Sequence, residues 1–489
     1  MPVWIIIGIA FIVLVAVMFF RTFSGFNKGE GVEPVSVSPA DSAVLSAHLS
    51  EVVQIKTVSR VGSDDKEKEP FLAVHRWMES TYPNLHNYLD KEIVNTHSLL
   101  YTWRGSDSAL EPVLFNAHMD VVPVSKETLA GWSVEPFSGQ IKNGYVWGRG
   151  TLDMKNQLVA LLEAVEALLK EGYTPRRTIY LAFGHDEEIM GYYGSRNIMK
   201  KLKSKNTRLA AVFDEGGMIT RGMLPGVEEP IALVGNTEKG YLTLEVSAQG
   251  NPGHSSTPPR QTAIGVLARA LALMDDHPMH ATLDYFLPTL MIIRHHLPFG
   301  LQFIIANSWL FKPLLIKKLE QSPKMNAMLR TTNAATVIAG GVKDNVLPAT
   351  ASAKVNCRVL PGDSVQSVID HFEKAINDPR VKVKIDEKNG GWEASAVSST
   401  HTAAYRTLDL VIKQIFDDVT VAPFTFLAAT DSRHYQPICD NIYKFSPIEM
   451  TPKEQDGAHG INEKVSVKSL GKMVVFFKRL MVVWGDAGF

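Results

Sequence analysis

Cysteine is almost absent from this chain of 489 residues, which contains only Cys357 and Cys439. Two cysteines exclude a disulfide framework and a zinc site built from thiolates. An excess of either charge is also missing, because 50 Lys and Arg residues are balanced by 51 Asp and Glu residues. We therefore expect no nucleic-acid partner. The sequence also has no Asn-x-Ser/Thr glycosylation signal and no internal repeat, which excludes a solenoid.

Apolar residues are abundant enough for a large folded body. Hydrophobic residues make up 45% of the chain and charged residues 21%, a composition typical of globular rather than disordered proteins. At about 150 residues per domain, the length suggests about three domains.

Residues Val3 to Phe20 form an uninterrupted apolar run without a charge. A helix of this length spans ~27 Å, close to the ~30 Å hydrocarbon core of a bilayer. A cleaved signal peptide is the alternative, but no Lys or Arg precedes the run and Arg21-Thr22-Phe23 is not a small-residue cleavage site. The sequence therefore favours a membrane anchor over residues 1–22, followed by a Gly-, Pro- and Ser-rich linker over residues 23–42.

Two features of the sequence disagree on the side of the membrane. Arg21 and Lys28 follow the apolar run, which by the positive-inside rule favours a cytoplasmic body. Single N-terminal anchors with a large following domain nevertheless often export that domain. We expect a membrane protein whose body is extracytoplasmic.

Short apolar runs alternate with longer amphipathic segments through residues 43–238. Strands are expected at residues 113–115, 178–183 and 209–213, with a helix at 158–169. Alternation of strand and helix predicts an α/β domain with a mostly parallel central sheet and helices on both faces.

A second pattern replaces the first over residues 239–390. Strands are expected at 241–246, 331–339, 351–359 and 381–385, and helices at 261–273 and 364–376. These elements form a compact α+β unit. The first pattern returns over residues 391–489, so we expect the smaller domain to be inserted between two halves of one α/β domain.

Acidic and imidazole groups follow the expected strands or precede the long helix. In chain order they are His118, Asp120, Asp153, Glu187, Glu188 and Asp214. Ligands of open α/β sheets bind beyond the carboxyl ends of the strands. A single acid there is usually a helix cap or solvated, but several on one edge, without cysteine, indicate a metal site of nitrogen and oxygen ligands.

The number of candidate ligands fits two zinc ions. Catalytic zinc keeps about three protein ligands and an open position, and paired metals need a bridging ligand. Asp153 can bridge with its two oxygens, while His118 and Asp214 complete one metal and Glu188 serves the second. The second metal needs one more ligand, for which His459, in a glycine-rich stretch, is the best candidate.

The ordered motifs resemble those of the di-zinc aminoacylase/carboxypeptidase family. They are His118-x-Asp120, Gly148-Arg149-Gly150-x-x-Asp153-x-Lys155, Asp186-Glu187-Glu188, Asp214-Glu215-Gly216 and Gly457-x-His459-Gly460. The resemblance covers roughly Ser50 to the C-terminus. It implies an α/β catalytic domain divided by a lid domain and two zinc ions per subunit. It also implies the ligand set: His118 and Asp214 on one ion, Glu188 and His459 on the other, and Asp153 between them.

Two further acids receive roles other than metal binding. Asp120 can accept the ring N–H of His118 and fix its tautomer. Glu187, beside Glu188, is expected to be the general base that takes a proton from water and returns it to the leaving amine. Either could instead be a solvated acid at a strand end, and the family pattern favours the catalytic roles.

Three residues of the inserted domain also match the family pattern. The resemblance implies that His254 stabilises the oxyanion, often in the active site of the other subunit, so a homodimer through the lid is expected. Asn345 and Arg358 would bind substrate, and arginine suits a carboxylate. Taken alone, His254 could be any loop histidine, Asn345 a turn cap and Arg358 part of a surface ion pair.

Residues 283–319 form an apolar segment that shorter family members lack. Such a segment packs the core of the lid, covers a dimer interface or forms an acyl-chain groove, and the first is the default. The segment resembles the subgroup of carboxypeptidase S and the N-fatty-acyl-amino-acid synthase/hydrolases. Together with the expected anchor, it favours a lipid-like substrate.

These features predict a zinc-dependent hydrolase that cleaves the amide bond of N-acyl amino acids next to a free carboxylate. N-fatty-acyl amino acids, and the reverse condensation, fall within this prediction. A carboxypeptidase or dipeptidase acting on small peptides is the alternative. A receptor on an inactive peptidase fold would have lost ligands, whereas all five ligand positions and Glu187 are intact.

Overall fold

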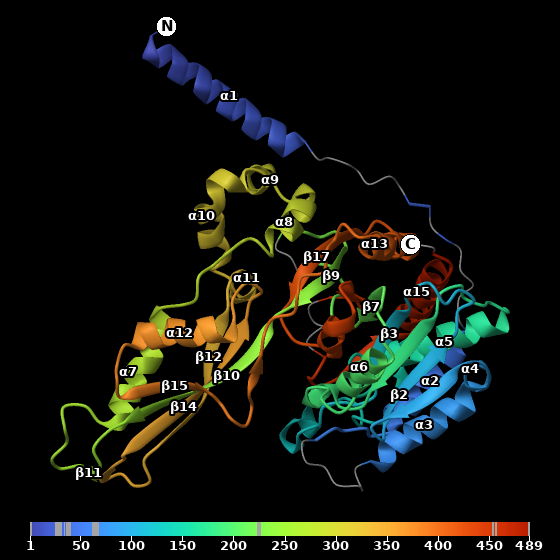
Figure 1. The fold of residues 1–489 in the computed structure, drawn as a ribbon, viewed down its shortest axis with the longest axis horizontal. Coiled ribbons are helices and arrows are strands. Elements are labelled where there is room, and N and C mark those ends of the chain that lie inside the picture. The colour runs from blue at the N-terminus through green and yellow to red at the C-terminus, as the bar shows by residue number, and fades with distance from the viewer. Residues whose placement is uncertain are drawn as a thin grey trace.

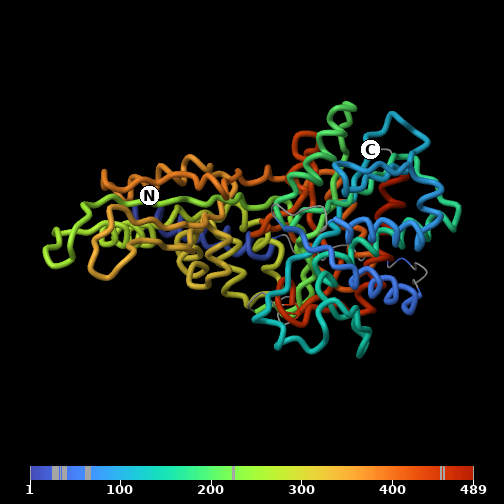
Figure 2. Tube along the Cα trace, turned by 90° about the horizontal axis from the view of Figure 1, so that it is seen from below, coloured from blue at the N-terminus to red at the C-terminus, as the bar shows by residue number. Residues whose placement is uncertain are grey.

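The fold consists of an α/β domain and a smaller α+β lid inserted into it, seen in a computed structural model (Figure 1). The structure describes residues 2–24, 32–33, 35, 41–60, 68–222, 226–451, 454 and 457–487. Most of the linker expected over residues 23–42 lies outside the described residues. The lid projects from one side of the larger domain (Figure 2). The fold class expected from the sequence is confirmed.

The α/β domain is built on a ten-stranded mixed sheet. Its order is β1 (Asp90–Val94), β2 (Ser98–Trp103), β6 (Ile179–Gly184), β3 (Val113–His118), β7 (Ala211–Asp214), β18 (Ile442–Lys444), β9 (Ile231–Glu238), β8 (Ile219–Thr220) and β19 (Glu449–Met450), with β17 (Thr420–Phe426) beside β9. Strands β6, β3, β7 and β18 run parallel. Every residue of β3 is buried, which explains the apolar run at its start, Val113–Phe115. The parallel strands bring their carboxyl ends to one edge.

Helices cover both faces of this sheet. One face packs against α2 (Ser42–Gln54), α3 (Glu69–Thr81), α4 (Pro83–Tyr88), α5 (Lys155–Lys170), α13 (Ala403–Ile415) and α15 (Val467–Asp486), and the other against α6 (Ser195–Ser204) and η5 (Asp431–Ile438). Helix α5 is buried over most of its length and lies beside α15. Helix α5 begins two residues after Asp153. The start of this helix therefore holds Asp153 at the carboxyl edge of the sheet.

The lid is a five-stranded sheet with helices on one face. Its order is β12 (Thr332–Gly340), β14 (Thr350–Val359), β10 (Gly240–Gln249) and β15 (Val381–Ile385), with β16 (Gly391–Trp392) also beside β10. Helices α7 (Ala263–Asp276) and α12 (Val365–Ile376) pack on it through a separate apolar core. Only Lys239 separates β9 from β10, so the chain passes almost straight from one sheet into the other.

The apolar segment at 283–319 forms short helices between α7 and β12. They are α8 (Leu287–Ile293), α9 (Phe299–Ala306) and α10 (Ser308–Leu319), and α11 (Pro323–Leu329) follows. Their buried side chains, such as Leu290 and Ile305, pack together with Ile231 of β9 and Ala422 of β17. Part of the segment is therefore core, but it packs on strands of the catalytic domain rather than on the lid core expected from the sequence.

Helix α1 (Val3–Phe23) projects beyond the rest of the fold on the side of α8 to α10 (Figure 1). The helix has 21 residues, its most apolar 18-residue window has a mean hydropathy of 3.1, and only 6% of that window is buried. It is long and apolar enough to cross a membrane, and an N-terminal signal sequence shares these features.

Candidate metal centre

Two histidines are joined by one carboxylate beyond the carboxyl end of β3. Oδ1 of Asp153 lies 3.0 Å from Nε2 of His118, and Oδ2 lies 2.9 Å from Nε2 of His459. Each oxygen of Asp153 therefore faces a different imidazole. This is the geometry of a carboxylate that bridges two metal ions.

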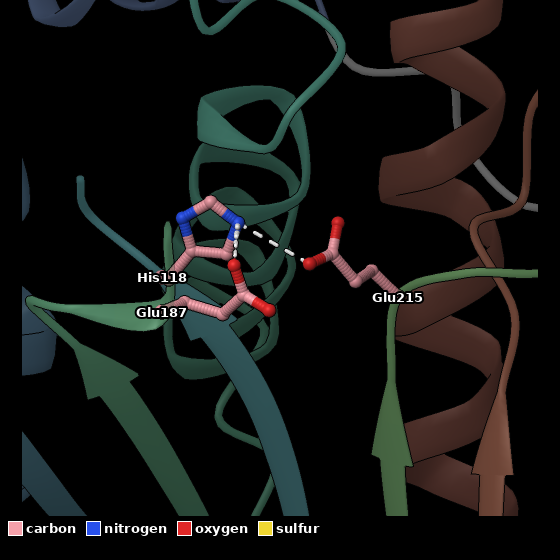
Figure 3. A group of neighbouring side chains, drawn as sticks. All are labelled: His118, Glu187 and Glu215. Carbon is pink, nitrogen blue, oxygen red and sulfur yellow. Dashed lines mark ion pairs between the residues drawn. The ribbon is translucent and has the colours of Figure 1, made fainter. Parts of the chain in front are cut away.

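Three glutamates surround this pair of histidines. Oε1 of Glu215 lies 3.2 Å from Nε2 of His118, and Oε2 of Glu187 lies 4.0 Å from the same nitrogen (Figure 3). Oε2 of Glu188 lies 3.2 Å from Nε2 of His459. Two groups of candidate ligands result: His118 with Glu187 and Glu215, and His118 with Asp153 and Glu188.

Asp120 is fully buried and holds the segment that carries two of these glutamates. Its carboxylate accepts the backbone N–H groups of Glu187 and Glu188, each at 3.1 Å, and the hydroxyl of Ser59 at 2.6 Å. Nδ1 of His118 lies 3.0 Å from the backbone oxygen of Asp120 and 3.4 Å from its Oδ1. The oxygen nearest to Nδ1 of His118 is therefore the backbone oxygen of Asp120, and the Asp120 carboxylate binds the backbone of the two glutamates instead.

Glu463 orders the loop that presents Asp153. Its Oε1 accepts the backbone N–H groups of Gly150, Leu152 and Asp153 at 3.0, 2.7 and 3.2 Å. Its Oε2 pairs with Nη1 of Arg149 at 2.6 Å. The loop needs glycine at position 150, where φ is +90° and a Cβ would lie 2.7 Å from Val121.

The charge balance of the site favours bound cations. Burial raises the pKa of Glu187, and burial together with the charge of Asp153 raises the pKa of Glu215 to about 8. Burial and the charge of Asp153 likewise raise the pKa of Glu188, whose Oε1 is buried without a hydrogen-bond partner among the described residues. Dications would stabilise the ionised carboxylates and occupy that free oxygen. The residues therefore fit a pair of metal ions.

Asp214, expected to be a ligand of the His118 metal, is not brought to His118. Its Oδ1 accepts the side-chain amide of Asn116 and its Oδ2 accepts the backbone N–H of Ser432, both at 2.9 Å. Asp214 is the last residue of β7, and its neighbour Glu215 turns toward His118 instead.

His254 and Asn345 lie together but far from His118. His254 is exposed on β11 (Gly253–His254), which pairs with β13 (Val346–Leu347). The backbone oxygen of Asn345 accepts the N–H of Ser255 at 3.2 Å. Figure 1 places β11 at the far tip of the lid, away from the carboxyl ends of β3 and β7. A single chain therefore does not bring these lid residues into its own centre.

Arg358 lies at the base of the lid in a stack that reaches the catalytic domain. Its guanidinium is 5.0 Å from the ring centre of Tyr241, whose ring stacks on Trp392 at 4.8 Å. On the other domain, Arg433 lies 4.7 Å from the ring of Trp392. The structure thus places Arg358 at the junction of the two domains.

Sequence reasoning missed the positions of Glu215, Glu463 and Ser59. Glu215 is part of the motif Asp214-Glu215-Gly216, next to the predicted ligand Asp214, and Glu463 follows His459 by four residues, just beyond the motif that ends at Gly460. Ser59 had no signal, because it is a lone hydroxyl in an otherwise unremarkable stretch.

The fold and this centre define the class of metal-dependent hydrolases with a divided catalytic domain. The sequence profile of Peptidase family M20/M25/M40 matches residues 114–482, and the chain belongs to this family. It is accordingly a metallohydrolase of a family that is typically dinuclear.

Relatives of known name are similar over nearly the whole chain. A probable carboxypeptidase S-like protein of Dictyostelium discoideum is 37% identical, with 98% of this chain and 93% of the relative covered. An N-fatty-acyl-amino acid synthase/hydrolase of Xenopus tropicalis is 36% identical, with 97% and 93% covered. Carboxypeptidase S of Saccharomyces cerevisiae is 30% identical, with 93% and 88% covered.

Solved structures share the fold at low identity. An M20 family metallo-carboxypeptidase of Sulfolobus solfataricus superposes with a TM-score of 0.65 at 18% identity, covering 90% of this chain and 99% of that one. A dinuclear metal-binding peptidase of the family from Bacillus subtilis gives a TM-score of 0.55 at 13% identity, with 91% and 99% covered.

Proposed function

We propose that this protein uses two zinc ions to hydrolyse the amide bond of N-acyl amino acids, including N-fatty-acyl amino acids, next to a free carboxylate. The observation that carries the proposal is the Asp153 carboxylate, whose two oxygens face His118 and His459 separately. The similarity to an N-fatty-acyl-amino acid synthase/hydrolase supports the substrate class. A reversible reaction is part of the proposal.

The proposed ligand set departs from the sequence expectation at one position. His118, Asp153, Glu188 and His459 keep their expected places, and Glu215 takes the place of Asp214. The reason is that Glu215 lies 3.2 Å from Nε2 of His118, whereas both oxygens of Asp214 already accept hydrogen bonds. When bound, the ions activate water and polarise the scissile carbonyl.

Glu187 is proposed to move the proton. It is buried beside the histidine pair, and burial raises the pKa of its carboxyl, which suits a group that must both accept and donate a proton. It would take a proton from the attacking water and pass it to the leaving amine nitrogen. Asp120 positions Glu187 through the hydrogen bond to its backbone N–H.

A homodimer is proposed to complete the site. Strand β12 is an edge of the lid sheet and exposes Val337 and Ile338, and such an edge can pair with a second copy. The partner subunit's His254 would then supply the oxyanion contact that the chain's own His254 is too distant to make. Arg358 and Asn345 are proposed to bind the substrate carboxylate.

We also propose that α1 remains as a membrane anchor and that the body is extracytoplasmic. The exposed apolar surface and length of α1 support an anchor. Retention is tested by the N-terminal sequence of the mature protein, and the side by protease protection in sealed vesicles.

Hydrolysis of a matched substrate pair tests the activity. A long-chain N-acyl amino acid and a dipeptide with the same C-terminal residue are compared in wild type and Glu187→Gln. Preference for the acyl substrate with loss of turnover in Glu187→Gln supports the proposal. Preference for the dipeptide establishes a carboxypeptidase or dipeptidase, the activity that the carboxypeptidase S relatives favour. Zinc-loaded protein that cleaves neither refutes both.

A further inference from the structure

The helices α9 and α10 are only partly buried by the fold. Their inner side chains, such as Ile305 and Leu315, belong to the core shared with β9 and β17. Their outer side chains remain exposed: Phe299 by 49%, Trp309 by 52% and Leu314 by 52%. Leu301 and Leu310 extend the same surface. We call these five exposed side chains the α9–α10 surface. The two helices contact each other, and exposed apolar side chains gathered on neighbouring elements mark an interaction site.

The end of α1 packs directly on this surface through aromatic rings. The ring of Phe19 lies 6.4 Å from that of Phe299 and 5.5 Å from that of Phe303. The ring of Phe23 lies 6.0 Å from that of Phe299. The α9–α10 surface is thus continuous with the last turn of an apolar helix.

Polar contacts fix this junction. Asn307, fully buried between α9 and α10, donates its side-chain amide to the backbone oxygen of Met18 at 3.1 Å and to the hydroxyl of Thr22 at 3.2 Å. Arg294 donates to the backbone oxygen of Ser24 at 2.8 Å. The end of α1 is therefore held in register with α9 and α10.

The position of this junction along α1 sets its depth in a bilayer. At ~1.5 Å per residue, the helix is about as long as the ~30 Å hydrocarbon core. Its last turn, with Phe19 and Phe23 beside Arg21, then lies at the boundary between lipid and water, where aromatic and basic residues gather. Helices packed on that turn lie at the same depth.

The shape and charge of α9 and α10 suit that boundary. Together they are as apolar as a membrane span, but the chain bends by 119° between them, so they do not form one straight span. Residues 287–319 contain no Asp or Glu but include Arg294, Lys312, Lys317 and Lys318. In a membrane, the apolar side chains would contact the acyl chains and the basic side chains would contact anionic phospholipid headgroups. This combination fits a membrane surface better than the surface of a second protein.

We propose that α9 and α10 form a second membrane-contacting element, which inserts the α9–α10 surface into the bilayer leaflet that receives the C-terminal end of α1. The proposal rests on α1 remaining as the anchor, and it is independent of the substrate. It seats the protein on the membrane by two attachments rather than by α1 alone.

Site-specific fluorescence in lipid vesicles tests this proposal. The full chain is reconstituted in vesicles of zwitterionic and anionic phospholipid after one residue is changed to cysteine and labelled with an environment-sensitive fluorophore. Both native cysteines are buried, so labelling is selective. The test variants are Trp309→Cys and Leu314→Cys. The control is Leu72→Cys, an exposed leucine on α3 at the opposite end of the molecule (Figure 1). Ile12→Cys, in the middle of α1, reports on the anchor itself.

Nitroxide-bearing phospholipid is expected to quench the labels at 309 and 314, and aqueous iodide is not. The label at 72 should be quenched by iodide and not by the phospholipid. Iodide quenching at 309 and 314 with lipid quenching at 12 would overturn the proposal while leaving the anchor intact. Protection from both quenchers would also overturn it, because a second copy of the chain then covers the surface. Absence of lipid quenching at 12 would refute the anchor, and the proposal with it.

Discussion

Replacing Glu463 by glutamine tests whether one buried carboxylate holds the loop that presents Asp153. Glu463 is fully buried, accepts three backbone N–H groups of residues 150–153 and pairs with Arg149 at 2.6 Å. Glutamine preserves the shape but removes the charge. It also turns an amide NH2 toward a donor, because every partner of Glu463 is a donor.

The expected loss follows from the burial of the pair. Removing one partner of a buried ion pair costs ~3–5 kcal/mol because the other charge is left uncompensated. Arg149 keeps hydrogen bonds to the backbone oxygens of His459 and Gly460 at 3.2 and 2.9 Å, so we expect a value near the lower limit, about 3 kcal/mol. Since Arg149 and Glu463 together order both Asp153 and His459, zinc affinity should fall by ~10–100-fold.

Zinc competition with a chelator and urea unfolding measure the two effects of Glu463→Gln. The matched control is Glu449→Gln, which removes an exposed pair with Arg221 at 2.9 Å and should change stability by less than about 1 kcal/mol. If Glu463→Gln binds zinc as wild type does and unfolds at the same urea concentration, the loop is not held by this carboxylate and the reasoning is wrong.

Three further predictions concern other parts of the molecule. Glu215→Gln should lower the zinc content of the protein, whereas Asp214→Asn should retain both zinc ions while lowering the urea midpoint; the opposite pattern in elemental analysis would restore Asp214 as the ligand. Burial lowers the pKa of His75 from 6.5 to about 4, so the neutral form is favoured in the folded state, and stability should fall as the pH drops from 6.5 toward 4. Urea midpoints between about pH 7 and about pH 5 should change less in His75→Gln than in wild type, and equal pH dependence would contradict the assignment. Trp392→Ala should speed limited proteolysis between lid and catalytic domain, whereas Trp392→Phe, which keeps a ring in the stack, should not; equal cleavage of both would show that the stack does not join the domains.

The long buried elements could be predicted because their periodicity and burial agree. The strand expected at 113–115 is the start of β3, and the helix expected at 158–169 lies within α5. Both are central elements whose apolar pattern is set by contact with the sheet or with helices on it. The inserted lid was equally predictable, since its alternating strand β14 buries every second residue.

The lid residues show a limit of the same reasoning. The sequence identifies His254 and Asn345 only as two separate motif residues, and the pairing of β11 with β13 brings them together in the structure. Local sequence does not specify where the tip of a domain points. That direction is set by the junction at Lys239 and Trp392, where the chain enters and leaves the lid. The proposed role of His254 would therefore require a second subunit.

The choice between Asp214 and Glu215 shows why spacing alone does not identify a ligand. Successive side chains of a strand point to opposite sides. The position at which the strand ends therefore decides whether Asp214 or Glu215 points toward His118. In this chain Asn116 of the neighbouring strand and the backbone N–H of Ser432 together bind both oxygens of Asp214. Neither partner is adjacent to Asp214 in sequence, and Ser432 comes from the other half of the divided domain. Once these contacts hold Asp214, Glu215 is the next carboxylate that can reach His118.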